Sequence, residues 1–169
     1  MGVSKLTGHS GNDELRTPAY IYDWLNRRFQ FSLDAAATHK NRLADVYCTT
    51  EGTFFLSEWA WEPKVVTPWD ERDGLTYPWA NSRVFLNPPY SRPLFGQFIE
   101  KAIQERDAAE IIVMLVKWDT STENARLLRQ YAHIEELRRV SYDDENGNPL
   151  PAATFASAIA ILRPTEPRR

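Results

Sequence analysis

The sequence predicts a single α/β domain whose central sheet is mostly parallel. Apolar runs of strand length alternate with helical patterns, which is typical of a parallel sheet covered by helices. Residues 110–116 (EIIVMLV) are almost continuously apolar, as expected of a strand that is buried on both faces. The last two predicted strands, over residues 137–142 and 154–162, have no helix between them. We therefore expect an antiparallel C-terminal pair of strands at one edge of the sheet.

The first predicted elements follow a polar N-terminus. Residues 1–15 are rich in Gly, Ser, Asn and Asp, and they predict a flexible N-terminal arm. Thr17 suits the N-cap of a helix, and Pro18 suits its first position. Apolar residues four positions apart predict one buried face for this helix: Ile21, Leu25 and Phe29. A short strand is then expected to end at Asp34.

The middle of the chain gives a weaker pattern. Residues 41–79 hold four of the six tryptophans, and within them only Val65 and Val66 indicate a strand. A clear strand follows at residues 84–86 (VFL). The apolar spacing over residues 95–106 then predicts an amphipathic helix.

The C-terminal part contains one more predicted helix. Thr120 and Glu123 have the spacing of a capping box, and the helix after them is expected to extend to about Ala132. The two C-terminal strands complete a domain that we expect to span residues 16–163. Residues 164–169 predict a polar tail.

The composition is ordinary for a globular protein. Of 169 residues, 43% are hydrophobic and 25% are charged, and the formal net charge is −3. The single cysteine, Cys48, excludes a disulfide within the chain, and three scattered histidines predict no metal site. No apolar run approaches the roughly 18–20 residues of a membrane span, and the N-terminus lacks the apolar core of a signal peptide. We therefore expect a cytoplasmic protein without a membrane partner.

Polar residues follow three of the predicted strands, at Asp34, at Asn87 and at residues 117–119 (KWD). Ligands of α/β sheets bind beyond the carboxyl ends of the strands, so these residues predict a site. In residues 87–90 (NPPY), two prolines with fixed φ and no N–H make the strand end rigid. The Asn87 side-chain oxygen and the Pro88 carbonyl could accept both N–H bonds of an exocyclic amine on a nucleobase. The Tyr90 ring could stack on that base.

The motif NPPY is similar to the [Asn/Asp/Ser]-Pro-Pro-[Tyr/Phe] motif of amino-methyltransferases that use S-adenosylmethionine. An ordered series of stretches resembles the phage-type DNA N6-adenine methyltransferases (Dam-like) over most of the chain: ELRTPAYIYDWLN, FSLDAAATHKN, DGL, VFLNPPYS, IVMLV with DTST, and NPLPAATFASAIAIL. This resemblance implies a Rossmann-like methyltransferase fold, S-adenosylmethionine as cofactor, and adenine N6 in DNA as the acceptor, with the base flipped from the duplex. A phage-encoded enzyme would act in the cytoplasm of the host cell.

The resemblance also implies roles for individual residues. The expected catalytic residues are Asn87, Pro88, Pro89 and Tyr90. The expected cofactor-binding residues are Thr17, Pro18, Asp34, Ala35, Ala36, Asp73, Leu75 and Asn87. The expected substrate-binding residues are Tyr90, Ser91, Lys117, Trp118 and Asp119. Two features depart from the family pattern: the turn after Asp34 has no glycine, and residues 52–68 resemble an insertion.

Alternatives remain for both the residues and the function. Asp34 could cap a following helical turn, Asp73 could belong to a simple turn, and Asp119 could begin a capping turn. NPPY could serve only to end a strand. The chain could instead methylate another planar amine or amide, in RNA or on a protein glutamine. It could also be a weak or inactive methyltransferase-fold protein that binds nucleic acid or another partner.

Overall fold

The computed structural model describes residues 15–38, 40–50, 53–55, 64–65, 73–144 and 146–165. The predicted arm lies outside these residues except for Leu15, as do most of segment 52–68 and residues 166–169 of the predicted tail. The helices are α1 (Ala19–Phe29), α2 (Leu94–Glu105) and α3 (Glu123–Tyr131). The strands are β1 (Leu33–Asp34), β2 (Val46–Cys48), β3 (Thr53–Phe55), β4 (Lys64–Val65), β5 (Arg83–Leu86), β6 (Ile111–Lys117), β7 (His133–Leu137) and β8 (Ser157–Leu162). No helix among the described residues is long and apolar enough to cross a membrane.

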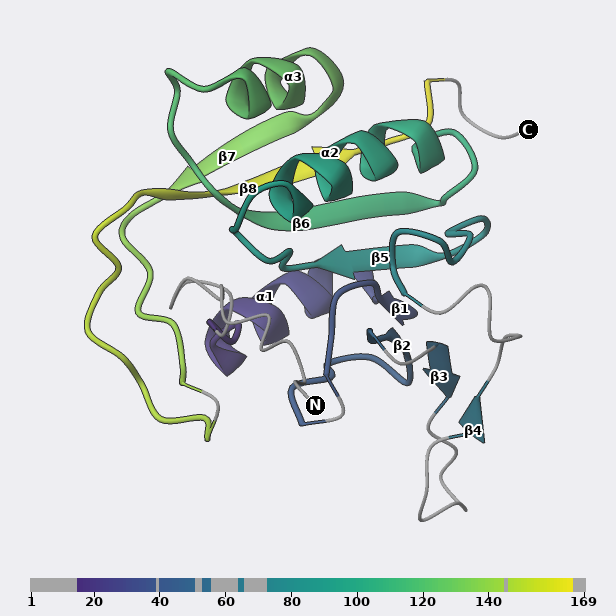
Figure 1. The fold of residues 1–169 in the computed structure, drawn as a ribbon, viewed down its shortest axis with the longest axis horizontal. Helices are drawn as coiled ribbons and strands as arrows, with labels where there is room; N and C mark the ends of the chain where they lie inside the picture. The colour runs from purple at the N-terminus through teal and green to yellow at the C-terminus, as the bar shows by residue number, and fades with distance from the viewer. Residues whose placement is uncertain are drawn as a thin grey trace, which may run out of the picture.

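The strands form one sheet in the order β4-β3-β2-β1-β5-β6-β8-β7 (Figure 1). The central strands β2, β1, β5 and β6 are parallel, and β8 pairs antiparallel with both β6 and β7. The predicted α/β fold, with its parallel centre and antiparallel C-terminal pair, is therefore confirmed. A second antiparallel pairing joins β2, β3 and β4 at the other edge. These strands have only two or three residues each, which is too short to produce a readable alternation in the sequence.

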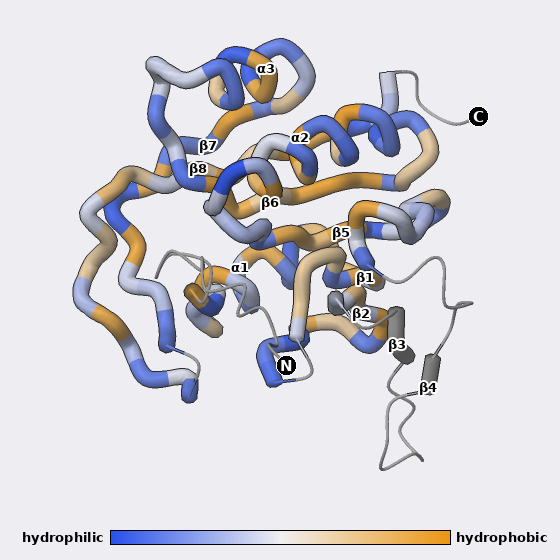
Figure 2. Tube along the Cα trace, viewed as in Figure 1, coloured by the Kyte–Doolittle hydropathy of each residue, from blue (hydrophilic) through white to orange (hydrophobic). Residues whose placement is uncertain are grey.

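Two apolar cores lie on opposite faces of the sheet. Alternate residues of β6, such as Ile112 and Met114, belong to one core with α2 and α3, while Ile111 and Val113 belong to the other with α1. Figure 2 shows the resulting hydrophobic colour along the central strands. Each fully buried Val, Leu or Ile contributes roughly 1.5–3 kcal/mol, so a strand buried on both faces anchors the domain. The apolar run of residues 110–116 predicted this position correctly.

Three local predictions were wrong. The structure places the N-cap of α1 at Pro18, and no side chain caps this helix. In α3 the cap is Thr122, whose hydroxyl oxygen accepts from the Ala125 N–H at 3.2 Å, and not Thr120. The strand expected at residues 137–142 is β7, which ends at Leu137. β7 is an edge strand with a His and two Glu residues, and such charge is common at sheet edges but hides the strand from an apolar-run criterion.

Gly74 allows the turn after residue 72 to pack against the end of β1. A β-carbon at this position would lie 1.8 Å from the Ala35 carbonyl oxygen, which is backbone and cannot rotate away. We expect Gly74→Ala to lower the free energy of unfolding by roughly 1–3 kcal/mol or more, because the two segments must separate. Urea denaturation monitored by circular dichroism measures the change.

Gly96 in α2 provides the matched control. A β-carbon there would meet only the Asn124 Oδ1 atom, at 3.8 Å, which is an ordinary contact. We expect Gly96→Ala to leave stability unchanged or to raise it by about 0.5–1 kcal/mol, since alanine is the better helix former. Equal stability of the two variants would contradict the close packing at Gly74.

Candidate active site

The candidate site lies where the strand order reverses. From β1 the chain moves outward through β2, β3 and β4, and it returns to β5 on the other side of β1. β1 and β5 are parallel neighbours, with Leu33 opposite Val84 and Asp34 opposite Phe85. Ligands of open α/β sheets bind in the crevice at such a switch point, beyond the carboxyl ends of the strands. Asp34 and Asn87 therefore lie at the edge and position where a ligand is expected.

The Asn87 side chain is fixed at both of its polar atoms. Its Nδ2 donates to the Leu15 carbonyl oxygen at 3.0 Å, and its Oδ1 accepts from the Tyr90 hydroxyl at 3.0 Å. Pro88 is buried, so the strand end cannot swing freely. An amide oxygen can accept two hydrogen bonds, and the Tyr90 hydroxyl occupies only one of them. The second remains as an acceptor with a defined orientation.

The Tyr90 hydroxyl belongs to a chain of hydroxyl groups. It lies 3.0 Å from the Tyr142 hydroxyl, which lies 3.0 Å from the Ser157 Oγ, and it also lies 3.3 Å from the Leu115 carbonyl oxygen, a longer contact than the one to Asn87. Burial raises the pKa of Tyr90 well above its usual value and also raises the pKa of Tyr142. Both tyrosines therefore remain neutral near pH 7 and act only through hydrogen bonds and packing.

Aromatic neighbours hold the Tyr90 ring. The rings of Phe95 and Phe155 lie edge-on to it, with centroid distances of 5.5 and 5.7 Å. The sequence did not reveal Tyr142 or Ser157 as part of this site, because both are distant from NPPY along the chain and nothing in their own stretches indicates a contact with Tyr90. The edge-on packing orients the ring, and base stacking by Tyr90 stays a prediction.

We expect Tyr90→Phe to slow the methyl transfer that the resemblance implies, roughly two- to tenfold. The ring and its packing are retained, but the hydrogen bond that holds the Asn87 amide is removed, and such a bond contributes about 0.5–1.5 kcal/mol. Tyr131→Phe is the matched control, since Tyr131 is an exposed residue of α3. Single-turnover rates of the two variants test this, and equal rates would show that the hydroxyl does not position Asn87.

Asp34 is a buried carboxylate at the end of β1. It is 2% exposed, and its oxygens accept from the Leu43 N–H at 3.1 Å and the Ala36 N–H at 3.4 Å. Burial raises its pKa to about 7, and the two backbone hydrogen bonds oppose that rise only in part. Within the described part of the chain, no Lys or Arg forms an ion pair with it. A buried carboxylate of this kind is suited to a cationic group supplied by a ligand.

The segment before α1 adds a buried hydroxyl group that has no described partner. Thr17 is 8% exposed, and its hydroxyl has no hydrogen-bond partner among the described residues. The preceding Leu15 accepts the hydrogen bond from Asn87, and Arg16 pairs antiparallel with Asp143. Thr17 and Pro18 are thus held beside the NPPY motif. Buried hydroxyls are normally hydrogen-bonded, so the Thr17 hydroxyl is free to bond a ligand.

The turn that contains Asp73 packs on the turn that follows Asp34. Asp73 Oδ1 accepts from the Leu75 and Thr76 N–H groups at 3.0 and 3.1 Å, so this carboxylate caps its own turn. Gly74 touches the backbone of Ala35, as described above. The predicted cofactor residues Ala35, Ala36, Asp73 and Leu75 lie together, and their roles stay predictions.

The four other predicted substrate residues have different surroundings in the structure. The Lys117 ammonium lies 5.3 Å from the Phe155 ring, which itself packs on Tyr90. Trp118 is 6% exposed, and its Nε1 donates to Glu136 at 2.9 Å, so its described contacts are those of a core residue. Asp119 accepts from the Ser121 N–H and hydroxyl, and therefore caps a turn. The Ser91 carbonyl begins the turn into α2 by accepting from the Phe95 N–H at 3.0 Å. Lys117 thus contacts the aromatic surroundings of Tyr90, and the substrate roles of all four residues stay predictions.

The fold and the arrangement of strand ends define a Rossmann-like methyltransferase domain. The chain belongs to the family described as DNA N-6-adenine-methyltransferase (Dam), whose model matches residues 4–169. It is similar to the DNA N-6-adenine-methyltransferase of Escherichia phage T1, with 33% identity over 107 residues. That match covers 63% of this chain and 36% of the phage T1 protein, so the chain corresponds to little more than a third of that relative.

Proposed function

We propose that this protein transfers a methyl group from S-adenosylmethionine to the exocyclic N6 of adenine in DNA, after the base has left the duplex. The observation that carries the proposal is the Asn87 amide, fixed at both polar atoms beside the switch point of the sheet. Membership of the Dam family and the similarity to the phage T1 protein support it.

The residues of the crevice fit S-adenosylmethionine. Its cationic amino group matches the buried carboxylate of Asp34, which has no cationic partner in the described part of the chain. The hydroxyl of Thr17, which has no hydrogen-bond partner among the described residues, provides a further hydrogen-bonding group. Ala35, Asp73 and Leu75 would hold the remainder. When bound, S-adenosylmethionine supplies an electrophilic methyl group.

Asn87 and Pro88 would prepare the adenine amine for attack. The nitrogen lone pair is delocalised into the ring, which makes the amine a weak nucleophile. Acceptance of its two N–H bonds by the Asn87 Oδ1 and the Pro88 carbonyl favours a tetrahedral nitrogen, whose lone pair is localised. Because the nitrogen becomes acidic only once it carries the methyl group, no strong base is required before attack. The surplus proton can then leave to solvent.

Adenine must reach this clamp outside the base stack, which costs a few kcal/mol. Tyr90 would hold the flipped base by stacking, and Ser91, Lys117, Trp118 and Asp119 are the other proposed substrate residues. We place this activity in a domain of residues 16–163, flanked by an arm of residues 1–15 and a tail of residues 164–169.

Incubation of the full chain with S-adenosylmethionine and unmethylated DNA tests the proposal. Mass spectrometry of the digested DNA should detect N6-methyladenine, and calorimetry should detect cofactor binding. Cofactor binding without DNA methylation, but with methylation of RNA or of a protein glutamine, would redirect the proposal to another acceptor. Absence of cofactor binding would favour a nucleic-acid or partner-binding role.

A further inference from the structure

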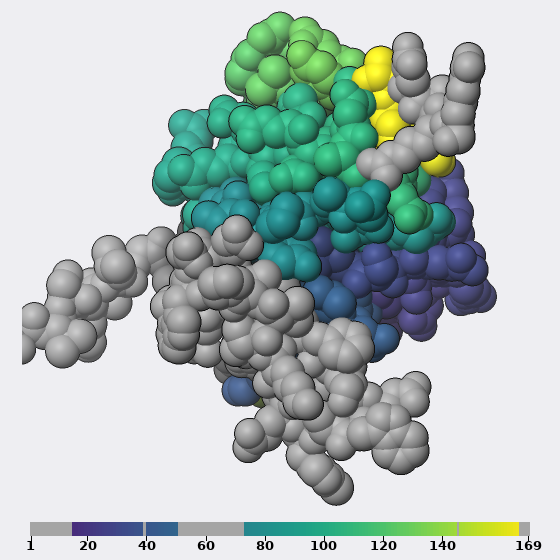
Figure 3. Space-filling view, turned by 90° about the vertical axis from the view of Figure 1, so that its right-hand side faces the viewer, coloured from purple at the N-terminus to yellow at the C-terminus, as the bar shows by residue number. Residues whose placement is uncertain are grey.

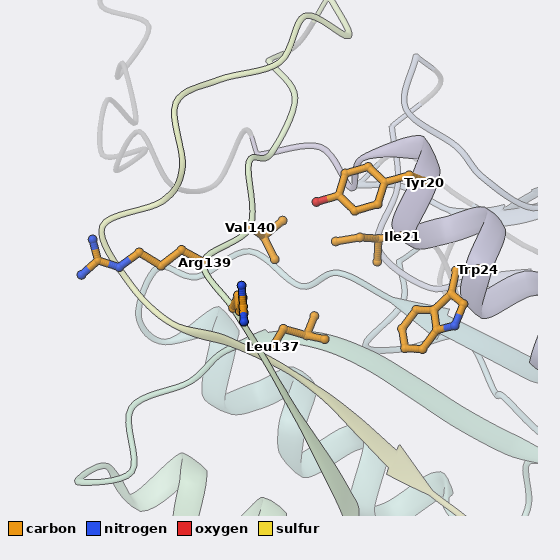
Figure 4. A pocket seen from close by; sticks show the side chains of 7 residues that line it. Tyr20, Ile21, Trp24, Leu137, Arg139 and Val140 are labelled. Carbon is orange, nitrogen blue, oxygen red and sulfur yellow. The ribbon is translucent and has the colours of Figure 1, made fainter.

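A pocket of about 290 Å³ lies between α1 and the segment that follows β7, away from the crevice at Asp34. Its walls combine aromatic and apolar side chains with two guanidinium groups: Tyr20, Trp24, Leu137, Arg138, Arg139 and Val140. Figure 4 shows Tyr20 and Trp24 projecting from α1, with Leu137 and Val140 opposite them. We call this the α1–β7 pocket.

The α1–β7 pocket is exposed and positively charged. Tyr20 and Trp24 are 63% and 43% exposed, which is unusual for large aromatic side chains. Arg138 and Arg139 are exposed, and neither forms an ion pair with any residue that the structure describes. None of the lining residues is acidic.

A salt bridge joins the two walls outside the pocket. Arg28 of α1 binds Glu135 of β7 through two hydrogen bonds, of 2.6 and 2.8 Å. This bridge neutralises the nearby carboxylate and holds α1 against β7. Glu135 is therefore already paired, and the arginines of the pocket remain available for a ligand.

The pocket adjoins the candidate active site. β7 and β6 are both antiparallel to β8, so they run in the same direction and end at the same edge of the sheet. Arg138 and Arg139 follow the end of β7 at this edge, which is also the edge of Asn87. Tyr20 lies three residues after Thr17, and two residues beyond Val140 the Tyr142 hydroxyl reaches Tyr90.

We propose that the α1–β7 pocket binds the DNA strand beside the target adenine. The backbone phosphates would lie on Arg138 and Arg139, and a neighbouring base or sugar would lie against the rings of Tyr20 and Trp24. A chain of net charge −3 binds a polyanion only through such local positive surfaces. The inference rests on the proposed function, since it assumes that DNA approaches the Asn87 edge.

The double variant Arg138→Ala/Arg139→Ala tests the charged wall. We expect its affinity for a fluorescently labelled duplex, measured by anisotropy, to fall about tenfold or more at low salt. The slope of log affinity against log salt should become shallower by roughly 0.9 for each phosphate that the variant no longer neutralises. Arg163→Ala is the control. Arg163 follows β8, which is antiparallel to β6, so its C-terminal end lies at the opposite edge of the sheet from Asn87. Figure 3 shows the molecule from that side. The Arg163→Ala variant should bind DNA as the wild type does, and calorimetry should show unchanged S-adenosylmethionine affinity in both variants.

Trp24 tests the aromatic wall with a separate readout. DNA should quench part of the tryptophan fluorescence of the wild type, and this part should be absent in Trp24→Phe. Trp24→Ala should weaken DNA binding more than Trp24→Phe, which keeps a ring.

If the wild type methylates DNA and the double variant binds DNA with wild-type affinity and salt slope, the inference about the pocket is overturned and the proposed function stands. If the wild type neither binds nor methylates DNA, both proposals are overturned. An arginine variant that loses binding to RNA or to an acidic protein but not to DNA would also overturn the inference.

Discussion

Replacement of Asn87 by alanine is expected to slow methyl transfer about a hundred- to thousandfold, while S-adenosylmethionine still binds. The variant removes the side-chain acceptor that we propose localises the lone pair on the adenine amine. This interaction is stronger in the transition state than in the ground state, so its removal lowers the rate of the chemical step. Removal of a comparable fixed donor or acceptor costs about 2.7–4 kcal/mol. Single-turnover measurements with DNA and saturating cofactor give the rate directly.

Asn26→Ala provides a matched control for this experiment. The Asn26 Oδ1 accepts from the Phe31 N–H at 2.8 Å after the end of α1, so the variant also loses a local hydrogen bond of an asparagine. We expect it to lose about 1 kcal/mol of stability and to keep the wild-type transfer rate per folded molecule. If Asn87→Ala behaved in the same way, NPPY would be only a strand-ending turn.

The sequence predicted those parts of the fold that depend on local pattern. β6 could be recognised because a strand buried on both faces must be apolar throughout, and α2 could be recognised because its apolar face repeats with the helical period. β7 was misplaced by several residues because an edge strand needs little burial and tolerates its glutamates. The cap at Thr120 was misassigned because Ser121 and Thr122 also have suitable side chains, and only the backbone path decides which one reaches a free N–H. At Thr17 the helix begins one residue later than expected, with Pro18 as the N-cap and no capping side chain.

The sequence predicted which strand ends form the candidate site, but not the contacts between their side chains. Asp34 and Lys117 end β1 and β6, and Asn87 follows β5, so topology alone brings them to one edge of the sheet. The contacts between them depend on tertiary packing, which the sequence does not display. Tyr142 reaches Tyr90 only because the chain leaves the sheet after Leu137, and Gly74 meets Ala35 only because two turns face each other. The same packing gives Trp118 the contacts of a core residue, which its position after a predicted strand could not reveal.

Replacement of Asp34 is expected to weaken S-adenosylmethionine binding tenfold or more. Asp34→Ala removes the buried carboxylate proposed to pair with the cationic amino group of the cofactor, and loss of one partner of a buried pair is strongly destabilising. Asp34→Asn keeps the shape and removes the charge, so it should lose a similar factor. Calorimetric titration of the folded variants measures both. Wild-type affinity in Asp34→Asn would show that the cofactor amino group is bound elsewhere.

The pH dependence separates a charge-pairing role for Asp34 from a purely structural one. Burial raises the pKa of Asp34 from 3.8 to about 7 in the folded state. Between about pH 4 and 7 the carboxyl is therefore protonated in the folded protein without cofactor but ionised in the unfolded chain. The folded state therefore binds more protons across this interval, and its stability falls as the pH rises from about 4 to 7, by roughly 4 kcal/mol at most. A cationic ligand selects the ionised carboxylate, so wild-type cofactor affinity should rise between about pH 6 and 7, before an α-amino group of pKa about 7.7–8.0 loses much of its own proton. In Asp34→Asn both trends should flatten, as measured by urea denaturation and by calorimetry at matched pH values. A wild-type affinity that is constant over this interval would contradict the pairing, even if Asp34→Ala binds the cofactor weakly.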